Sequence, residues 1–420
     1  ANLGLVDWAE LYSITDVNQA VEILYNNLNL AKNKSTKIVN IKVNDRTETI
    51  KPWVTKGILN SMNRRDKLKN KLNKQPYNTI LRREYNNLRN RITTLTRAAR
   101  DDYYSEEFEI NKNKPYKLWK LLNEAACRSN KKQNKEFPIE KWIDEKGKKM
   151  CTKDIANKLN NFFVNVGSEQ ANRTKSRNPR APTTRKRDSM SLCPITEKEV
   201  MEICKTLKIN TASGIDNISA STIKNNADLL TKPLTHIYNL SIATGVFPKA
   251  FKTAKIAPLH KTGDESNPEN YRPISLISVL SKIFEKIIKK KLMDYLQKIQ
   301  YILPNQFGFQ SDKGVDDALY EFTNFVLKAI DSKNKILSCF LDVSKCFDCI
   351  NKKHLLVKLE SIGIRGITHD WFSSYLMDRE QVVAIGDVYS DTAKLEEYSI
   401  SQGTALAPIL FLIYINQACD

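Results

Sequence analysis

The sequence predicts an α+β fold in which helices surround a small sheet. Apolar residues recur at helical spacing over residues 283–292 and again over residues 315–326. Residues 382–388 have the pattern of a β-hairpin that turns at Gly386-Asp387. A short apolar run, residues 336–341, follows a polar loop and has the length of a buried strand.

Residues 1–171 are expected to form a helical, basic N-terminal extension, whose clearest feature is a run of positive charge. Residues 51–100 hold 14 Lys or Arg and only two acids, Asp66 and Glu84. Helix-forming residues dominate there, and Pro76 predicts a break between two helices. One interpretation is a pair of solvated amphipathic helices. The other, which the one-sided charge favours, is a surface that binds nucleic-acid phosphates.

A second basic stretch, residues 172–193, is predicted to be a linker. Its first part, residues 172–187, contains seven basic residues, two prolines and no acid, and this composition disfavours a packed core. The residues that we expect to bind nucleic acid come from both basic stretches: Arg64, Arg65, Lys67, Lys69, Arg82, Arg83, Arg89, Arg91, Arg185, Lys186 and Arg187.

The whole chain carries a large positive charge. Its 420 residues include 67 Lys or Arg against 47 Asp or Glu, which gives a net charge of +20. Such an excess predicts a polyanionic partner. Nucleic acid is favoured over a membrane because no apolar run approaches the roughly 20 residues of a spanning helix. The eight cysteines show no disulfide framework, and Cys346 with Cys349 lacks the second ligand pair that a zinc site needs.

Residues 194–420 are expected to form one compact unit, and its most informative feature is the end of the predicted strand 336–341. Asp342 follows this apolar run directly. An ionised Asp is almost never buried without a partner. We therefore expect its carboxylate to face a cleft, where a metal ion would neutralise it. A helix-capping Asp after an ordinary strand is the alternative.

The segment from Phe340 to Asp348 resembles motif A of reverse transcriptases, specifically those of non-LTR (LINE-type) retrotransposons. Seven further motifs follow the family's order across more than 200 residues, which makes the resemblance specific. They are Ser213-Gly214-Ile215-Asp216-Asn217-Ile218, Asn270-Tyr271-Arg272-Pro273-Ile274-Ser275-Leu276, Gln306-Phe307-Gly308-Phe309, Gly363-Ile364-Arg365-Gly366, Trp371-Phe372-Ser373-Ser374-Tyr375-Leu376, Gln402-Gly403 and Leu410-Phe411-Leu412-Ile413-Tyr414-Ile415-Asn416.

The resemblance implies a right-hand polymerase fold, with residues 194–420 as the fingers and an incomplete palm. Residues 1–193 are similar to the segment that such elements place between an endonuclease and the polymerase. The implied function is an RNA-directed DNA polymerase that copies element RNA by target-primed reverse transcription. The implied partners are an RNA template, a DNA primer or target and dNTPs, with no membrane. The implied location is intracellular, in the nucleus and cytoplasm.

The family's chemistry implies roles for individual residues. Two Mg²⁺ ions stabilise the attacking and leaving oxygens of nucleotidyl transfer. Asp342 matches the family's first carboxylate ligand, and Val343 matches its main-chain carbonyl ligand. Lys261 and Arg272 match fingers residues that contact the triphosphate, and their charge suits phosphate.

Other matched positions concern the sugar and the base of the incoming nucleotide. Phe347 matches the aromatic residue that lies under the sugar and excludes a 2′-hydroxyl. Gln402 and Gly403 match a pair that packs on the nascent base pair. Asp348 matches a family position that is not a metal ligand, and helix capping is its expected role.

The chain also departs from the family's pattern. Ser401 stands where Pro is usual, Ala407 where Gly is usual, Gln310 where Arg is common and Cys346 where Ala is usual. No aromatic-Ala-Asp-Asp motif, which supplies the family's other carboxylates, occurs in the sequence. We therefore expect an internal segment of a longer polypeptide that is inactive alone. The alternative function is a catalytically dead, nucleic-acid-binding remnant; the ordered motifs argue against a fortuitous resemblance in a host RNA-binding protein.

Overall fold

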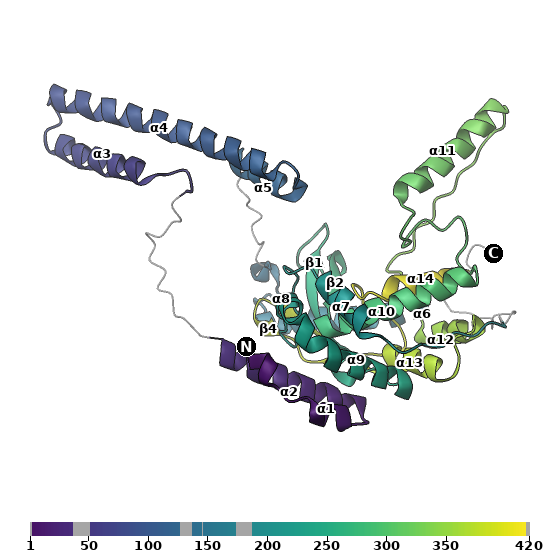
Figure 1. Ribbon diagram of the computed structural model, residues 1–420. Coiled ribbons are helices and arrows are strands. Elements are labelled where there is room, and N and C mark those ends of the chain that lie inside the picture. Colours follow the sequence, from purple (N-terminus) through teal and green to yellow (C-terminus); the bar gives the residue numbers. More distant parts are fainter. Residues whose placement is uncertain (1, 37–50, 127–136, 145, 174–186, 417–420) are drawn as a thin grey trace. The chain divides into compact units, whose positions relative to one another are not determined.

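The computed structural model describes residues 2–36, 51–126, 137–144, 146–173 and 187–416 (Figure 1). The chain divides into two compact units. The larger unit consists of residues 1–36 and 137–420, and the smaller one of residues 37–136. All the described strands belong to the larger unit.

The smaller unit is helical. Its helices are α3 (Lys56–Lys74), α4 (Thr79–Asn111) and α5 (Pro115–Ala125). Helix α4 packs against both α3 and α5. Thr55 and Asn78 cap α3 and α4, since each side chain accepts a hydrogen bond from a backbone N–H of the first turn. The prediction of two helices separated near Pro76 is confirmed.

In the larger unit, N-terminal helices pack on helices from the middle of the chain. The elements concerned are η1 (Asn2–Leu5), α1 (Ala9–Ser13), α2 (Val17–Ser35), α7 (Glu197–Lys205), α8 (Ala220–Asn225), α9 (Ala227–Thr244), η3 (Lys249–Phe251) and α10 (Val279–Lys298). Helix α2 buries Val21, Leu24 and Leu28 and packs on α9. The Tyr25 hydroxyl donates to Asp216 Oδ2 at 3.0 Å, which ties α2 to a loop of the central region.

This packing groups the chain differently from the boundaries expected from the sequence. Residues 1–36 and 137–171 fall within the expected extension 1–171, yet they lie in the same unit as residues 194–420. The reason is that α2 and the helix over residues 152–173 carry apolar faces, which are buried in this unit. Of the predicted linker, residues 174–186 lie outside the described residues.

A five-stranded sheet forms the second layer of the larger unit. Its strands are β1 (Thr253–His260), β2 (Tyr271–Leu276), β3 (Arg379–Ile385), β4 (Val388–Tyr389) and β5 (Ala393–Leu395). Strand β1 pairs antiparallel with β2 and parallel with β3, and β3 pairs antiparallel with β4 and β5. The predicted hairpin over residues 382–388 is confirmed, and Gly386 has the positive φ of 59° that its turn requires.

Helix α6 (Thr152–Arg173) packs against this sheet. Its residues Ile155, Leu159 and Phe163 share a buried cluster with Ile256 of β1 and Val383 of β3. Two short 3₁₀ turns, η2 (Ile139–Lys141) and η4 (Pro268–Asn270), precede α6 and β2. The helical prediction for residues 283–292 is confirmed within α10, whose Phe284 meets Trp371 edge to face, their ring centroids 5.3 Å apart.

Four further helices belong to the described part of the larger unit. They are α11 (Val315–Asp331), α12 (Lys352–Ser361), α13 (Gly366–Leu376) and α14 (Ala407–Ile415). The helical prediction for residues 315–326 is confirmed by α11. Among the described helices, none combines the length and the apolar character that crossing a membrane requires.

The predicted buried strand at residues 336–341 is wrong. This segment has no regular secondary structure, and Leu337 and Leu341 are 98% and 89% exposed. An apolar run becomes a strand only where a neighbouring strand accepts and donates its backbone hydrogen bonds. No described strand pairs with this segment. Its Phe340 ring instead contacts Phe322 of α11, with ring centroids 5.6 Å apart.

Candidate functional site

A pocket of about 660 Å³ lies where four segments of the larger unit meet. The segments are α6, the β1–β2 hairpin, the loop of residues 342–348 and Gln402. Its lining residues are Phe162, Phe163, Val166, Lys261, Thr262, Glu269, Asn270, Tyr271, Arg272, Pro273, Ile274, Asp342, Val343, Ser344, Lys345, Cys346, Phe347, Asp348 and Gln402.

The pocket brings together six of the seven residues expected to bind nucleotide or metal. Lys261, Arg272, Asp342, Val343, Phe347 and Gln402 all line it, although up to 141 positions separate them in sequence. Gly403 lies next to this lining at φ 102°, and a Cβ there would stand 3.0 Å from the Ser275 carbonyl oxygen of β2. Close approach and a left-handed backbone therefore both favour glycine at this position.

The β1–β2 hairpin presents the two cations. Lys261 N–H donates to the Asn270 carbonyl at 2.9 Å, which closes the hairpin loop, and Arg272 pairs with Leu259 in the antiparallel register. The side chains of Lys261 and Arg272 are both exposed. Two mobile cations on one side of a pocket suit a polyphosphate, because each can neutralise phosphate oxygens without first leaving a buried partner.

The 342–348 loop turns at Lys345, which has a positive φ of 52°. The Lys345 carbonyl accepts hydrogen bonds from the N–H groups of Asp348 and Cys349, at 2.9 and 3.2 Å. Phe347 is half-buried, its ring centroid 5.1 Å from that of Phe411 in α14. The carboxylate of Asp342 is exposed at the pocket. The loop thus presents a half-buried aromatic ring and an exposed carboxylate to the pocket.

Asp348 does not cap a helix, so that expectation is wrong. Asn351 is the N-cap of α12, and its side chain accepts from the His354 N–H at 2.9 Å. Asp348 is instead 8% exposed and accepts hydrogen bonds from Gln402 Nε2 at 3.3 and 3.4 Å. Burial raises the pKa of Asp348 to about 6, against the opposing effects of Lys345 and Gln402. No pattern in the sequence indicated this Asp348–Gln402 pair, which joins the 342–348 loop to the segment carrying Gln402.

A buried carboxylate holds the loop of residues 401–406 through a backbone hydrogen bond. Glu285 of α10 is fully buried, and its Oε2 accepts from the Ala405 N–H at 2.7 Å. The Tyr375 hydroxyl donates to Glu285 Oε1 at 3.2 Å. Burial raises the pKa of Glu285, while Arg379 and these hydrogen bonds oppose the shift. An acid inside the apolar stripe of residues 283–292 was the signal from which this role could have been predicted.

The oxygen donors of the pocket suit a hard cation only in part. The Asp342 carboxylate and the Val343 carbonyl are oxygen ligands of the kind that Mg²⁺ prefers, and Mg²⁺ sites often use one or two carboxylates together with substrate phosphates. Among the described residues, no three His, Cys, Asp or Glu side chains gather in a metal-binding cluster. The chain's own residues therefore fit a site that substrate phosphates and water complete.

The basic residues expected to bind nucleic acid lie elsewhere. Arg185 and Lys186 are outside the described residues, and Arg187 is exposed. The others belong to α3 and α4 of the smaller unit, where Arg82, Arg83, Arg89 and Arg91 are all exposed. Cys346 and Cys349 are free thiols, and burial raises the pKa of each.

Comparison with known proteins bears directly on this region. Residues 259–420 match the family described as "Reverse transcriptase (RNA-dependent DNA polymerase)". The chain is 31% identical over 54% of its length to the probable RNA-directed DNA polymerase from transposon BS of Drosophila melanogaster, covering 25% of that protein. It is 27% identical over 76% of its length to the RNA-directed DNA polymerase from mobile element jockey of the same species, covering 34% of it.

A third relative is the jockey polymerase of Drosophila funebris, 32% identical over 53% of this chain and 24% of the relative. The chain thus spans about a third or less of the length of these relatives. The matched residues include Lys261 and Arg272 of the β1–β2 hairpin, the 342–348 loop and Gln402. Residues 259–420 thus match the reverse transcriptase family, and the chain is similar to the reverse transcriptases of non-LTR (LINE-type) retrotransposons.

Proposed function

We propose that the chain contributes the nucleotide-binding part of an RNA-directed DNA polymerase that copies the RNA of a non-LTR element into DNA. One observation carries this proposal. The pocket gathers two exposed cations, an exposed carboxylate, an aromatic ring and an amide from segments far apart in sequence. These groups match, in type, the phosphates, metal, sugar and base of a nucleoside triphosphate.

In this proposal, Lys261 and Arg272 neutralise the triphosphate, and Phe347 lies under the deoxyribose, where a 2′-hydroxyl would meet its ring. Gln402 and Gly403 pack on the base pair that forms with the template. Asp342 and the Val343 carbonyl would hold Mg²⁺, on which this family generally depends. When bound there, the metal would supply charge stabilisation at the reacting oxygens.

The fold assignment follows from these roles. We assign the β1–β2 hairpin to the fingers because it carries Lys261 and Arg272, and the 342–348 loop to the palm because it carries Asp342. The smaller unit and its basic helices would hold the RNA template or the DNA target through phosphate contacts. Target-primed synthesis and the partners it needs belong to the same proposal.

Binding of dATP to the full chain tests the proposal. The chain is mixed with Mg²⁺ and an RNA template whose DNA primer ends in a dideoxynucleotide, with uracil as the next template base. Arg272→Gln should weaken dATP binding on the order of tenfold or more, because a charge-assisted contact to phosphate is lost. Asp342→Asn should remove most of the Mg²⁺ dependence. Lys394→Gln, an exposed change on β5, is the control.

A catalytically dead, nucleic-acid-binding remnant is the second candidate, favoured by the exposed arginines that α4 carries within a separate compact unit. The same experiment separates the two functions. A remnant binds the RNA–DNA hybrid but shows no dATP binding that responds to Mg²⁺, Arg272 or Asp342. Nucleotide binding that Lys394→Gln weakens as much as Arg272→Gln would contradict the proposed pocket.

A further inference from the structure

Helix α6 forms a wall of the nucleotide pocket, although it lies outside residues 259–420, which match the family. Phe162, Phe163 and Val166 of α6 line the pocket together with residues of the β1–β2 hairpin and the 342–348 loop. None of these residues belongs to a recognised motif. Their position raises the question of what α6 does for the loop that it faces.

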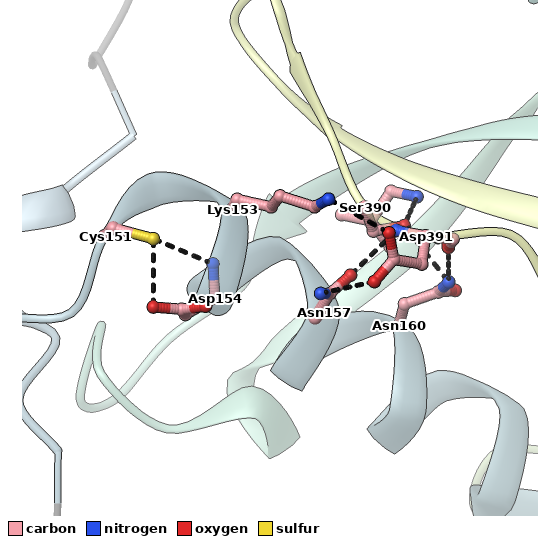
Figure 2. A network of polar contacts seen from close by, with 8 residues as sticks. Cys151, Lys153, Asp154, Asn157, Asn160, Ser390 and Asp391 are labelled. Carbon is pink, nitrogen blue, oxygen red and sulfur yellow. Dashed lines mark hydrogen bonds and ion pairs between the residues drawn. The ribbon is translucent and has the colours of Figure 1, made fainter.

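The N-terminal half of α6 is fixed to the edge of the sheet by polar contacts (Figure 2). Lys153 Nζ lies 3.1 Å from Asp391 Oδ1, and Asn157 Nδ2 donates to Asp391 Oδ2 at 2.9 Å. Asp391 N–H donates back to Asn157 Oδ1 at 2.8 Å. These reciprocal bonds fix both the rotation and the axial position of the helix.

A buried amide adds to this anchor. Asn160 Nδ2 donates to the Asp391 carbonyl at 2.9 Å and to Ser390 Oγ at 3.1 Å, as Figure 2 shows. Gln381 Nε2 of β3 donates to Asn160 Oδ1 at 2.9 Å. Asn160 is 2% exposed and Gln381 4% exposed, and the bonds of Asn160 to Gln381 and Ser390 are buried. Helix α6 is therefore held as a rigid extension of the sheet.

The C-terminal half of α6 touches the backbone of the 342–348 loop directly at Gly167. A Cβ on Gly167 would stand 2.1 Å from the Asp348 carbonyl oxygen and 2.7 Å from Tyr398 Cβ. Real contacts do not allow such distances, so any side chain here must displace the loop or the helix. Because α6 is anchored at its other half, the loop would move.

Five residues earlier on α6, the Phe162 ring contacts a charged side chain of the same loop. Lys345 Nζ lies 4.9 Å from the centroid of the Phe162 ring, a cation–π contact. Lys345 lines the pocket and adopts the positive φ at which the loop turns. Its ammonium is thus held at the pocket wall rather than left free in solvent.

From these contacts we infer that α6 positions the nucleotide-binding loop. Gly167 sets the place of Asp348 and, through the Asp348–Gln402 hydrogen bonds, that of Gln402. Phe162 holds the Lys345 ammonium where it meets a phosphate of the incoming nucleoside triphosphate. Gly167 and Phe162 are positioning residues, since neither touches the reacting atoms. This inference rests on the proposed function, because it takes a nucleoside triphosphate as the ligand of the pocket.

Nucleotide binding by α6 variants tests the inference, with dATP, Mg²⁺ and the dideoxy-terminated RNA–DNA hybrid described above. Gly167→Ala should weaken dATP binding on the order of tenfold, since ångström-scale displacement of a positioned group has effects of at least this size. Phe162→Leu should weaken it about two- to fivefold, the value of a partly exposed cation–π contact. Phe162→Tyr, which keeps the ring, should restore it. Asn165→Ala, at an exposed position of α6, is the control.

A second measurement reports on the loop without any nucleotide. Alkylation rates of Cys346 and Cys349 are followed peptide by peptide by mass spectrometry. Cys346 lies in the loop that α6 contacts and Cys349 follows it directly, and both thiols are partly buried. Gly167→Ala should raise these rates severalfold and leave that of Cys193, an exposed thiol elsewhere, unchanged. A general loss of folding would raise the reactivity of the buried Cys204 as well.

The outcomes separate the inference from the proposed function. If dATP binds and Arg272→Gln weakens it, while Gly167→Ala and Phe162→Leu behave like Asn165→Ala, α6 does not position the loop. If no variant or wild-type chain binds dATP, the proposed function fails, and with it the assignment of Lys345 to a phosphate. The alkylation rates then still decide whether Gly167 holds the loop: unchanged rates overturn that part too.

Discussion

Replacing Asp348 by Asn should stabilise the larger unit at neutral pH and have little effect in acid. Asp348 is 8% exposed, and burial raises its pKa from 3.8 to about 6. An acid whose pKa is raised by folding favours the folded state while it is protonated. This contribution is complete below the unfolded pKa of 3.8 and disappears as pH rises through about 6. At pH 7.5 the fold therefore carries an ionised, poorly solvated carboxylate.

The size of the effect follows from the shift. One pKa unit corresponds to about 1.4 kcal/mol, so moving from 3.8 to about 6 costs about 3 kcal/mol of folding free energy at pH 7.5. Asn has nearly the same shape, carries no charge and keeps an oxygen that accepts from Gln402 Nε2. We expect Asp348→Asn to recover up to about 3 kcal/mol at pH 7.5 and almost none at pH 4.

Urea denaturation of wild type and Asp348→Asn at pH 4, 5, 6 and 7.5 measures this difference. The circular dichroism signal reports both units, so tryptophan emission is recorded as well; Trp142 and Trp371 are buried in the larger unit. The matched control is Asp294→Asn. Asp294 lies on α10 and is exposed. A gain that is the same at every pH, or a loss at pH 7.5, would refute the account of Asp348 as a desolvated carboxylate.

Three further results are expected. Replacing Arg82, Arg83, Arg89 and Arg91 by Gln should lower the slope of the log of the RNA-binding constant against log salt by up to about 3, since each phosphate contact of single-stranded RNA contributes about 0.7. The control variant changes the exposed Lys198, Lys205, Lys208 and Lys232 to Gln. An equal fall of the slope in both variants would contradict a localised binding surface. Phe347→Ala should strengthen ATP binding relative to dATP, on the order of tenfold, in the assay with the RNA–DNA hybrid; an unchanged ratio would remove Phe347 from sugar selection. Glu285→Leu should destabilise the larger unit by about 1–3 kcal/mol in urea denaturation, because the Ala405 N–H loses its buried acceptor. Glu285→Gln keeps an acceptor and should cost less. Equal losses of stability in the two variants would refute the anchoring role of Glu285.

Local patterns in the sequence predicted much of the fold. The apolar stripes of α10 and α11, the β3–β4 turn at Gly386 and the break near Pro76 depend on residues close together in the chain. The membership of α2 and α6 in the larger unit could not be predicted in this way. An amphipathic helix shows that it needs a partner surface, but its sequence does not say which surface that is. Charge composition, which suggested the boundary at residue 171, carries no information about packing.

The failed strand at residues 336–341 shows a related limit. Its apolar residues predicted burial, yet Leu337 and Leu341 are almost fully exposed. A helix satisfies its hydrogen bonds internally, so α11 forms although none of its residues is buried. A strand depends on a neighbour, and no described strand pairs with this run. Apolar periodicity is therefore a safer guide to helices than to single strands.

In the candidate site, the motif residues were predicted from the sequence, whereas the residues that hold them in place were not. Asp342, Phe347 and Gln402 were predicted from motifs, and all three line one pocket. They lie outside helices and strands, so backbone hydrogen bonding alone does not fix their positions. Gly167 and Glu285 supply what is missing: Gly167 packs on the Asp348 carbonyl, and Glu285 accepts from the Ala405 N–H.

Gly167 and Glu285 both belong to helices, and helices keep their shape when a ligand enters or leaves. The 342–348 loop and the 401–406 loop are also joined to each other through the Asp348–Gln402 hydrogen bonds. Displacement at either support must therefore reach the other loop, and the variants of Gly167 and Glu285 should not act independently on dATP binding. Such coupling between contacting groups is the expected cause of non-additive double mutants. Additive effects would mean that each loop is held on its own.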